Sequence, residues 1–479
     1  MKLTLFAILL TFVACGNKQS ETNENTNITT ADPWQRCEEI IENLKDPVFP
    51  DKIFSILDYG AVADGETNCR EAINKAIVAC SEAGGGKVVV PKGEYLSGAI
   101  YLESNVNLHM EDGAVLMFST NPEGYLPLVY TRWEGVELMN YSPLIYSYKE
   151  KNIAVTGNGV LDGQAKKENW WKWNGGKRYI LNEGDPSQKD KANRLALFEM
   201  GEKGVPVKDR KFGDGHYLRP QFFQPYQCEN VLMQDFTIKS SPMWILHPVL
   251  CDNVIIRGVN VDSKGPNTDG CDPESCKNVL IENCTFNTGD DCIALKSGRN
   301  NDGRRINRPI ENVVVRNCNF KNGHGGFVVG SEITGGAKNI FVENCYMNSP
   351  HLTRAVRIKT NSARGGTIED VYIRNIEVGK VSESLLKVNL HYEDGEGHGH
   401  NPTVRNIVLE NITCKETRFP LFMLGYEDSK ISGVTLKNVT VEDAKEASII
   451  RHVGDIVMDD VKFQTSRKVN LWGTVVKEK

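Results

Sequence analysis

Residues 276–284 read CKNVLIENC, a short aliphatic run set between two asparagines with a cysteine at each end. The phrase returns along the chain, as ENVLMQD at 229–235, NVVVRNC at 312–318 and NIFVENC at 339–345. Aliphatic and β-branched runs of this length favour β-strands. A strand phrase that recurs many times predicts a solenoid, in which each repeat stacks on the previous one.

The spacing of the phrase is uneven, and this decides which kind of solenoid is expected. Between residues 231 and 434 its successive occurrences lie 23 to 36 residues apart, which suits a β-solenoid with loops of variable length better than a helical repeat. We therefore predict an all-β fold, a right-handed parallel β-helix. The first aliphatic residue of each phrase serves as a marker, at Ile153, Val231, Val254, Val279, Val313, Ile340, Val371, Ile407, Val434 and Val457.

Asparagines and cysteines keep fixed offsets from these markers. An asparagine precedes most markers by one residue, and another follows by four. Asparagine accepts left-handed turn conformations, and its amide can bond to the asparagine stacked above it.

Cysteines in register indicate stacking in the core rather than a metal site, because a ladder does not converge on one point. Disulfide bonds between cysteines of one ladder remain an alternative, since neighbouring coils lie only about 4.8 Å apart. These cysteines are Cys228, Cys251 and Cys276 before the marker, and Cys284, Cys318 and Cys345 after it.

The composition excludes several classes of protein. A hydrophobic fraction of 40% and a charged fraction of 25% argue against a largely disordered chain. The net charge of −6 argues against a general nucleic-acid binder, so no nucleic-acid partner is expected. After the first residues, no apolar run approaches the roughly 20 residues that a membrane-spanning helix needs.

The N-terminus has the pattern of an export signal. Residues 1–14 hold one lysine and an apolar run, and small residues flank Cys15. This resembles a bacterial lipoprotein signal, with Cys15 lipidated; the alternative is a plain secretory signal. Residues 15–35 are polar and predict a flexible tether, and 36–479 are expected to form one catalytic β-helix domain. We thus expect an exported lipoprotein of the periplasm or outer membrane surface, bound to the membrane only through its lipid.

Two segments outside the repeat have predicted structures of their own. Residues 68–83 show helical periodicity and predict a short N-terminal helix that caps the open end of the solenoid. Residues 163–219 contain no marker and predict long loops projecting from the stack. Trp170, Trp171 and Trp173 in this segment are interpreted as packing at the base of the loops, with a sugar-stacking platform as the alternative.

Charged residues interrupt neighbouring coils on the same side. Because coils stack in register, similar offsets from the markers place these groups on one face of the solenoid. A cluster of carboxylates costs stability, since each raises the pKa of the next, and such clusters usually indicate catalysis or a bound cation. Hydrolysis of a glycoside requires one protonated and one ionised carboxyl group, and cations beside them would bind an acidic sugar. The clustered residues are Asp269, Asp290, Asp291, His324, Arg357 and Lys359.

The motifs that carry these residues resemble those of a known family. NTDG at 267–270, GDD at 289–291, GHG at 323–325 and RIK at 357–359 occur in the order found in polygalacturonases of glycoside hydrolase family 28. SPMW at 241–244 matches as well, and FSILDYGAVADGE at 54–66 resembles the opening of β-helical pectin-degrading enzymes. The resemblance covers nearly the whole chain after the leader.

The resemblance implies an inverting hydrolase of α-1,4-galacturonosyl bonds in pectin that requires no metal or other cofactor. Asp290 would be the general acid, Asp269 and Asp291 would activate the attacking water, and His324 would tune the acid. Arg357 and Lys359 would bind a galacturonate carboxylate on the leaving-group side. Further substrate contacts are expected from Tyr392, Asn267 and Lys296.

The expected substrate is a pectic polysaccharide or an oligogalacturonide, and the expected state is a monomer. GHGGFVVGSE at 323–332 and KTNSARGG at 359–366 look like bacterial chain-end enzymes, and the long loops suit a walled cleft, so exo action is expected. Three alternatives stay open: a hydrolase of another galacturonate-containing glycan such as rhamnogalacturonan, a Ca²⁺-dependent pectate lyase, and a non-catalytic glycan-binding β-helix.

Overall fold

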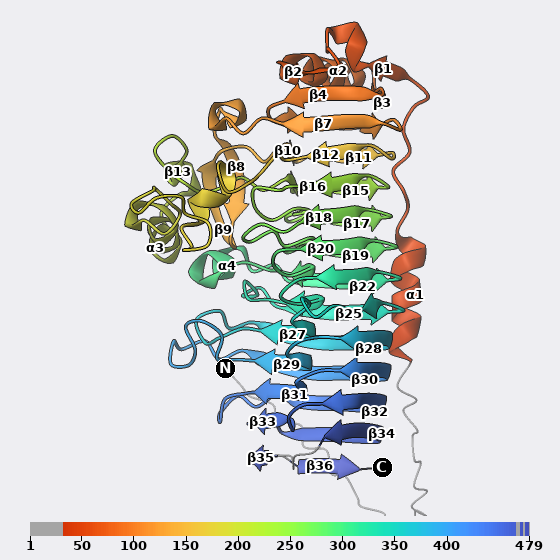
Figure 1. Ribbon diagram of the computed structural model, residues 1–479, viewed down its shortest axis with the longest axis vertical. Helices are drawn as coiled ribbons and strands as arrows, with labels where there is room; N and C mark the ends of the chain where they lie inside the picture. The colour runs from red at the N-terminus through yellow and green to blue at the C-terminus, as the bar shows by residue number, and fades with distance from the viewer. Residues whose placement is uncertain (1–31, 466–469, 473–474, 479) are drawn as a thin grey trace, which may run out of the picture.

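The computed structural model describes residues 32–465, 470–472 and 475–478. The expected signal peptide, Cys15 and most of the expected tether lie outside these residues. Figure 1 shows strands stacked along one long axis, with a smaller group of helices and strands attached to one side. The pairings within the stack are parallel, so the predicted parallel β-helix is confirmed.

Each coil contributes strands to more than one face of the stack. The first face consists of β1 (Ile53–Ser55), β3 (Gly86–Val90), β6 (Val106–Met110), β11 (Lys151–Thr156), β15 (Glu229–Gln234), β17 (Asp252–Arg257), β19 (Lys277–Glu282), β22 (Ile310–Arg316), β25 (Ala337–Glu343), β28 (Thr367–Lys380), β30 (Thr403–Glu416), β32 (Ser432–Ala444), β34 (Asp455–Thr465) and β36 (Val475–Glu478). The second consists of β2 (Asp64–Asn68), β4 (Gly93–Ser97), β7 (Ala114–Phe118), β12 (Val160–Asp162), β16 (Thr237–Lys239), β18 (Asn260–Ser263), β20 (Thr285–Thr288), β23 (Asn319–Asn322) and β26 (Tyr346–Met347), and it continues in the long strands β28, β30, β32 and β34.

The third face carries the functional residues. Its strands are β5 (Ile100–Tyr101), β10 (Ile145–Tyr148), β14 (Phe223–Tyr226), β21 (Ile293–Leu295), β24 (Phe327–Val329), β27 (Arg354–Lys359), β29 (Ser384–Asn389), β31 (Phe419–Leu424), β33 (Ile449–Arg451) and β35 (Asn470–Trp472). Isolated bridges join β14 to β21 through Leu246 and Cys271, so the face is continuous across the middle of the stack.

The observed register tests the sequence markers one by one. Ile153 pairs with Val231, and the pairing continues through all the later markers as far as Val434. In the coil of β34, however, Val434 pairs with Ile456, so the choice of Val457 was wrong by one residue. That coil has Asp455 and Asp460 at the two positions where the other marked coils have at least one asparagine, which removes the signal that sets the register.

The asparagines before the markers form a ladder along the stack. Asn253 and Asn278 have φ angles of 58° and 57°, the left-handed conformation expected of them. The amide of Asn253 donates to Asn230 over 3.1 Å, that of Asn278 to Asn253 over 3.0 Å, and that of Asn312 to Asn278 over 2.9 Å. A second ladder joins Asn344, Asn375, Asn411 and Asn438. Each rung satisfies a turn amide that would otherwise be left without a partner.

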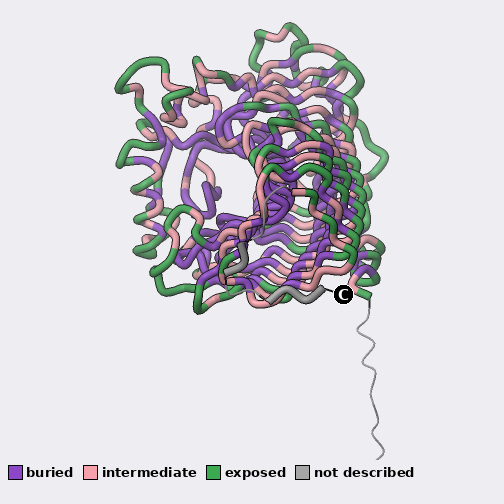
Figure 2. Tube along the Cα trace, turned by 60° about the horizontal axis from the view of Figure 1, so that its bottom comes forward, coloured by how far each residue is buried: buried purple, intermediate pink, exposed green. Residues whose placement is uncertain are grey.

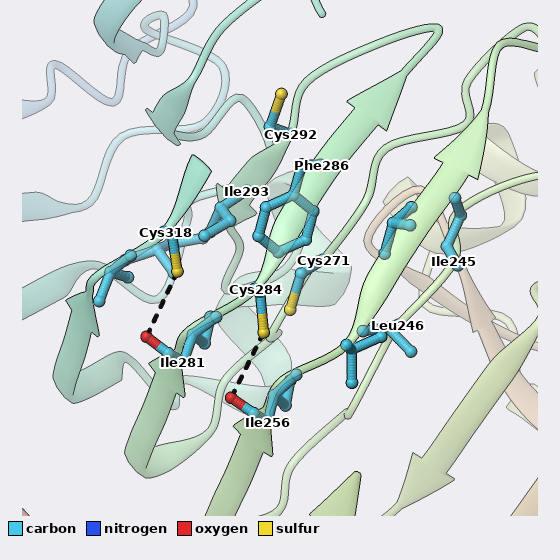
Figure 3. Packing of buried hydrophobic residues seen from close by; sticks show 14 of the residues in the cluster. Ile245, Leu246, Ile256, Cys271, Ile281, Cys284, Phe286, Cys292, Ile293 and Cys318 are labelled. Carbon is cyan, nitrogen blue, oxygen red and sulfur yellow. Dashed lines mark hydrogen bonds between the residues drawn. The ribbon is translucent and has the colours of Figure 1, made fainter. Parts of the chain in front are cut away.

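The core runs through the centre of the coils, as the buried inner trace in Figure 2 shows. The cysteine ladders belong to it, and the described cysteines are all buried and free of disulfides. Figure 3 shows the thiols of Cys284 and Cys318 directed at the carbonyl oxygens of Ile256 and Ile281. The interpretation of the cysteines as core residues is therefore confirmed.

Helix α2 (Arg70–Glu82) covers the N-terminal end of the stack, as predicted, and buries Ile73, Ala76 and Ile77. Helix α1 (Pro33–Asn43) packs on the outside of the first face, where Trp34 lies 5.6 Å from the ring of Phe341. The expected tether ran to residue 35, but α1 begins within it, because an aromatic contact fixes its first turn. Among the described residues, no helix is long and apolar enough to cross a membrane.

The group beside the stack contains an element that the sequence did not reveal. Strands β8 (Val129–Trp133) and β9 (Val136–Asn140) form an antiparallel hairpin, joined by β13 (Lys211–Phe212), α3 (Ala196–Glu202) and α4 (Asn300–Ile306). Short helical turns also occur in this region and elsewhere, η1 (Ile56–Tyr59), η2 (Pro122–Tyr125), η3 (Trp170–Asn174), η4 (Lys191–Leu195) and η5 (Val207–Asp209). Trp170 and Trp173 are buried 4.9 Å apart, and Trp171 is half-buried with its indole N–H bonded to the Ser241 carbonyl. The tryptophans thus pack the base of the segment, as expected.

Candidate active site

A cleft of about 490 Å³ lies on the outer side of the third face. Side chains alternate between the two faces of β27, which explains how its basic residues reach the cleft. Val356 and Ile358 point into the core, whereas Arg357 and Lys359 point to the opposite side and line the cleft. Eight of the nine residues predicted for the site line the cleft, and Asp291 lies fully buried beside it. The eight are Asn267, Asp269, Asp290, Lys296, His324, Arg357, Lys359 and Tyr392.

Two glycines of the sequence motifs allow the coils to carry carboxylates so close together. A Cβ atom at Gly289 would lie 2.1 Å from the carbonyl oxygen of Gly265 in the preceding coil, so no larger residue fits there. A Cβ atom at Gly325 would lie 2.4 Å from Val328 and 3.1 Å from the carboxylate of Asp291. The glycines of GDD and GHG therefore let neighbouring turns stack without displacing the acidic side chains.

The three aspartates converge as the register predicted. One carboxylate oxygen from each of Asp269, Asp290 and Asp291 lies within 4.8 Å of the other two. Burial raises the pKa of Asp269 well above its usual value, and the charges of Asp290 and Asp272 raise it further. Burial also opposes ionisation of Asp291, but Lys359, Arg357 and Lys296 outweigh it and lower the pKa of Asp291 to about 2. The cluster thus combines a carboxyl group that tends to hold a proton with one that stays ionised.

His324 bonds to the most exposed aspartate of the cluster. Its Nδ1 lies 2.8 Å from Oδ1 of Asp290, whose side chain is 20% exposed, whereas Asp269 and Asp291 are buried. The hydrogen bond and charge of Asp290 raise the pKa of His324 against the opposing effect of its partial burial. Arg354 donates to the carbonyl oxygen of His324 over 3.1 Å and fixes this loop. Asp290 is therefore the carboxyl group of the cluster that is best placed to meet a ligand in the cleft.

Arg357 and Lys359 lie beside Asp291 of the cluster and also line the open cleft. Lys359 Nζ lies 2.7 Å from Asp291 Oδ2, and Arg357 lies 3.6 Å from Asp291 Oδ1. Both cations also lie 5.2 Å from the ring of Tyr392, which stands as a wall over them. Burial opposes the charge of Lys359, but Asp291 raises its pKa, so the cation is retained. An acidic sugar beside Tyr392 would find two positive charges held in place.

Lys296 and Asn267 lie in the cleft but are bound mainly to the protein. Lys296 donates to the Gly330 carbonyl and to Glu332, each over 3.0 Å, and lies 4.6 Å from the ring of Trp244. The side-chain oxygen of Asn267 accepts bonds from Arg219 over 2.7 Å and from Asn174 over 2.9 Å. These contacts shape the floor of the cleft, and a role in binding substrate stays a prediction.

Comparison with known proteins decides the family. The model of glycosyl hydrolases family 28 matches residues 80–458, which is most of the chain. The chain belongs to this family. The expected site residues all lie within the matched range, as do the four motifs.

Similar proteins include a probable polygalacturonase of Vitis vinifera, 26% identical over 82% of this chain and 75% of that protein. An exo-poly-alpha-D-galacturonosidase of Dickeya chrysanthemi is 26% identical over 91% of this chain and 66% of its own length. Among solved structures, the hyperthermoactive exopolygalacturonase from Thermotoga maritima is 42% identical, covers 90% of this chain and 96% of its own, and has a TM-score of 0.87. A family 28 exopolygalacturonase of Yersinia enterocolitica shares the fold, with 24% identity, 90% and 78% coverage and a TM-score of 0.72.

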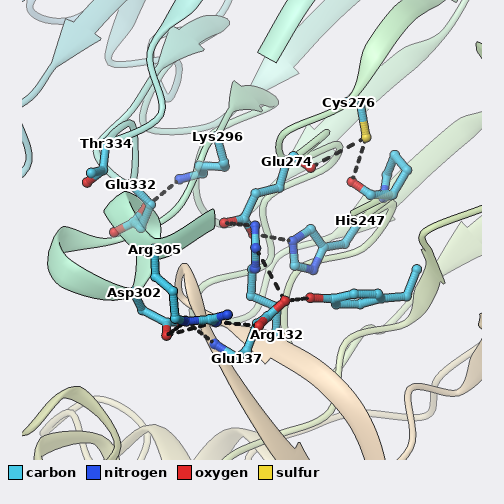
Figure 4. Close-up of polar contacts among 12 residues, drawn as sticks. Arg132, Glu137, His247, Glu274, Cys276, Lys296, Asp302, Arg305, Glu332 and Thr334 are labelled. Carbon is cyan, nitrogen blue, oxygen red and sulfur yellow. Dashed lines mark hydrogen bonds and ion pairs between the residues drawn. The ribbon is translucent and has the colours of Figure 1, made fainter. Parts of the chain in front are cut away.

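A buried ionic network, shown in Figure 4, holds the hairpin of this family 28 hydrolase against the stack. Arg132 of β8 lies 3.1 Å from Glu274 and 3.7 Å from Glu137, and His247 bonds to Glu274 over 2.9 Å. Glu274 pairs with Lys296 in the next coil, and Lys296 lines the cleft. The hairpin is therefore fixed to the third face beside the cleft, and its tip at Gly135 reaches Arg299 and Glu332.

Several residues that line the cleft of the hydrolase were not found from the sequence. Arg354 gave a weak signal as a third cation in the segment of Arg357 and Lys359. Glu134 and Arg194 gave none, because they belong to the segments outside the repeat and lie 60 positions apart. The other additional residues are Trp244, Ser331, Glu332, Thr353 and Glu393.

Proposed function

We propose that the protein is an exo-acting polygalacturonase, which hydrolyses α-1,4-galacturonosyl bonds at the end of pectic chains. The observation that carries the proposal is a carboxylate cluster in a cleft that Arg357 and Lys359 also line and that the tip of the β8–β9 hairpin enters at Glu134. The cations suit an acidic sugar, and a hairpin that narrows the cleft suits a chain end rather than an internal stretch. The names of its similar proteins, exopolygalacturonases among them, support the same activity.

The proposed mechanism assigns one step to each group. Asp290 donates a proton to the glycosidic oxygen, since it is the aspartate most exposed to the cleft, and His324 supports it by hydrogen bonding. Asp269 and Asp291 hold the attacking water, and Asp291, which stays ionised, accepts its proton. Arg357 and Lys359 bind the carboxylate of the sugar that carries the leaving oxygen. The remaining chain keeps the glycosidic oxygen as its new 4-hydroxyl group, and the released sugar gains the oxygen of the water at its anomeric carbon.

Inversion is proposed although the carboxylates are close together. Inverting glycosidases usually separate their carboxyl groups by about 6.5–9.5 Å, more than the 4.8 Å seen between oxygens here. Retention would need one carboxylate to attack the anomeric carbon directly. Asp269 and Asp291 are buried, and Asp291 is tied to Lys359, so neither is free to form that bond. A water held by the two is the remaining nucleophile.

A time course on polygalacturonic acid in the presence of EDTA tests the proposal. The time course follows four quantities together: the reducing ends, the ultraviolet absorbance of unsaturated products, the product size and the first anomer formed. We expect monogalacturonate alone from the start, no rise in absorbance, and the inverted anomer. Mixed oligomers would overturn exo action, an absorbance rise that EDTA abolishes would indicate a lyase, and no product would direct the search to a branched galacturonan.

The variant Asp290→Asn tests whether Asp290 is the general acid. It keeps the shape of the side chain but cannot supply the proton, so we expect turnover to fall by at least about a thousandfold with little change in KM. Thermal unfolding checks that the fold is retained. Activity within a few-fold of the wild type would exclude Asp290 as the acid.

We also propose that the protein is a monomeric lipoprotein of the cell envelope, anchored through Cys15. The proposal rests on the apolar leader and the cysteine that follows it. Helix α1 lies on the side of the stack away from the hairpin and α3 (Figure 1), so an anchor before α1 would leave the cleft facing outward. Radiolabelled palmitate should enter the wild type but not Cys15→Ser, which should leave the membrane fraction; equal labelling of both would contradict the proposal.

A further inference from the structure

Arg354 is a cation of the cleft that the proposed mechanism does not use. It begins β27, lines the cleft beside Arg357, and has 16% of its side chain exposed. One end nitrogen, Nη1, donates to the carbonyl oxygen of His324 over 3.1 Å, and the other, Nη2, forms an ion pair with Glu383. Because a guanidinium group carries five N–H donors, these two contacts leave donors for a ligand in the cleft.

Glu383 lies between Arg354 and a further cation, Lys387. Lys387 Nζ lies 2.5 Å from Glu383 Oε1, and Arg354 contacts the other oxygen, Oε2. All three side chains are largely buried. Burial lowers the pKa of Arg354 and that of Lys387, and the charge of Arg357 lowers both further. Two cations that share one carboxylate keep a surplus positive charge, which an anionic ligand would compensate.

The order of the coils places this group on the leaving-group side of the cleft. Strand β21, which follows the GDD motif, pairs with β24, β24 pairs with β27, and β27 pairs with β29. Figure 1 shows β27 and β29 following one another toward the C-terminal end of the stack. Lys387 pairs with Arg357 in the last of these steps, so it lies one coil further from the aspartates than Arg357 does.

Arg354 connects this further coil to the acid of the proposed mechanism. It reaches from the loop of His324, whose ring bonds to Asp290, to Glu383 beside β29. The general acid protonates the oxygen of the leaving group, so a cation fixed between the acid and the coil beyond Arg357 faces the departing chain. This direction rests on the proposed function, which assigns the leaving-group sugar to Arg357.

We propose that Arg354 binds the carboxylate of the second sugar on the leaving-group side, next to the sugar bound by Arg357 and Lys359. A galacturonate chain carries a carboxylate on every sugar, so a chain that continues past Arg357 brings a second anion to the cleft. Glu383 and Lys387 are positioning residues. Lys387 neutralises Glu383, so the charge of Arg354 stays available to the substrate. The subsite selects an acidic sugar over a neutral one, because a guanidinium group binds a carboxylate through charge-assisted hydrogen bonds.

The test compares two trisaccharides that differ in one carboxylate. One is trigalacturonate, and the other has galactose in place of the galacturonate at its reducing end. Cleavage of the first bond from the non-reducing end puts this third sugar in the proposed subsite. We expect the wild type to prefer trigalacturonate by at least tenfold in kcat/KM, mainly through KM. In Arg354→Ala the preference should fall to within about threefold.

Two further variants separate the charge from the fold. In Lys387→Met, Glu383 is left to Arg354 alone, so the preference should fall to a value between those of the wild type and Arg354→Ala. Arg354→Lys keeps a charge and should retain part of the preference. Arg405→Ala is the matched control, since it removes an exposed cation that pairs with Glu369 on the first face, and its preference should equal that of the wild type.

The ratio for the two trisaccharides reports the carboxylate and not the shape of the active site. Arg354→Ala also frees the loop of His324 and should lower kcat for both substrates alike. A wild type without preference, or a preference unchanged in both Arg354→Ala and Lys387→Met, would overturn the inference. Free galactose as the first product would show cleavage of the second bond and overturn exo action instead. If Arg354→Ala failed to fold, Lys387→Met and Arg354→Lys would still decide.

Discussion

Asp291 is a buried carboxylate whose charge depends on two residues that also face the substrate. Lys359 and Arg357 hold its pKa near 2 against the effect of burial, and both line the cleft. A substitution of either cation therefore changes two things, the binding of an acidic sugar and the proton balance of the carboxylate cluster. Loss of activity in such a variant cannot be assigned to binding alone, and KM and the pH profile have to be read together.

His324 should set the alkaline limit of activity. Its pKa is raised by Asp290, so the proton between His324 and Asp290 is retained above the pH at which a free histidine loses its proton, and it is lost as pH rises through the raised value. We expect kcat/KM to decline on the alkaline side at a pH above the ordinary histidine pKa. In His324→Asn that decline should disappear or move, with activity reduced at least tenfold at the optimum.

A pH series of kcat/KM for both proteins checks this. The stability of the folded enzyme has to be followed over the same range, since loss of the Asp290–His324 pair also removes its small contribution to folding at high pH. An alkaline limb that is identical in the two proteins would show that another group causes it.

At the scale of single elements, the asparagine ladder links each turn of the first face to the next. Asn278 donates to Asn253, accepts from Asn312, and adopts a left-handed conformation that alanine disfavours. We expect Asn278→Ala to lower the free energy of unfolding by about 2–3 kcal/mol, from two hydrogen bonds and backbone strain. Activity per folded molecule should stay near that of the wild type.

Thermal and urea unfolding measure this loss. Asn438→Ala is the matched control, because Asn438 also has a positive φ angle but stands at the end of the second ladder, where it donates a bond to Asn411. Its effect should be clearly smaller. Equal losses in the two variants would mean that the backbone conformation, and not the ladder, carries the stability.

The elements also show what sequence reasoning can and cannot reach. The offsets of asparagine and cysteine predicted the register of coils from Ile153 to Val434, since stacking makes every coil obey the same local rule. The coil of β34 lacks the asparagine, and there the register was missed by one residue. The motifs located the aspartates, His324, Arg357 and Lys359. The β8–β9 hairpin could not be predicted, because Arg132 and Glu137 are buried by pairing with distant residues that no local pattern announces.

At the scale of the whole molecule, the proposed exo action determines how fast a polymer is shortened. An enzyme that removes sugars only from chain ends shortens a polymer slowly, whereas one that cuts internally halves it early. We therefore expect reducing ends to accumulate from polygalacturonic acid while the viscosity of the solution falls only slightly. Viscometry and a reducing-end assay on the same sample check this, and an early collapse of viscosity would contradict exo action.

The hairpin tip in the cleft, which suits exo action, also bears on what limits the enzyme in its surroundings. Under exo action, each polysaccharide molecule offers a single point of attack, however long it is. The effective substrate concentration is then the molar concentration of termini and not the mass of pectin present. The same mass of polymer becomes a better substrate after fragmentation, so the yield of this hydrolase in a mixed digest depends on how fast internal cleavage creates new ends.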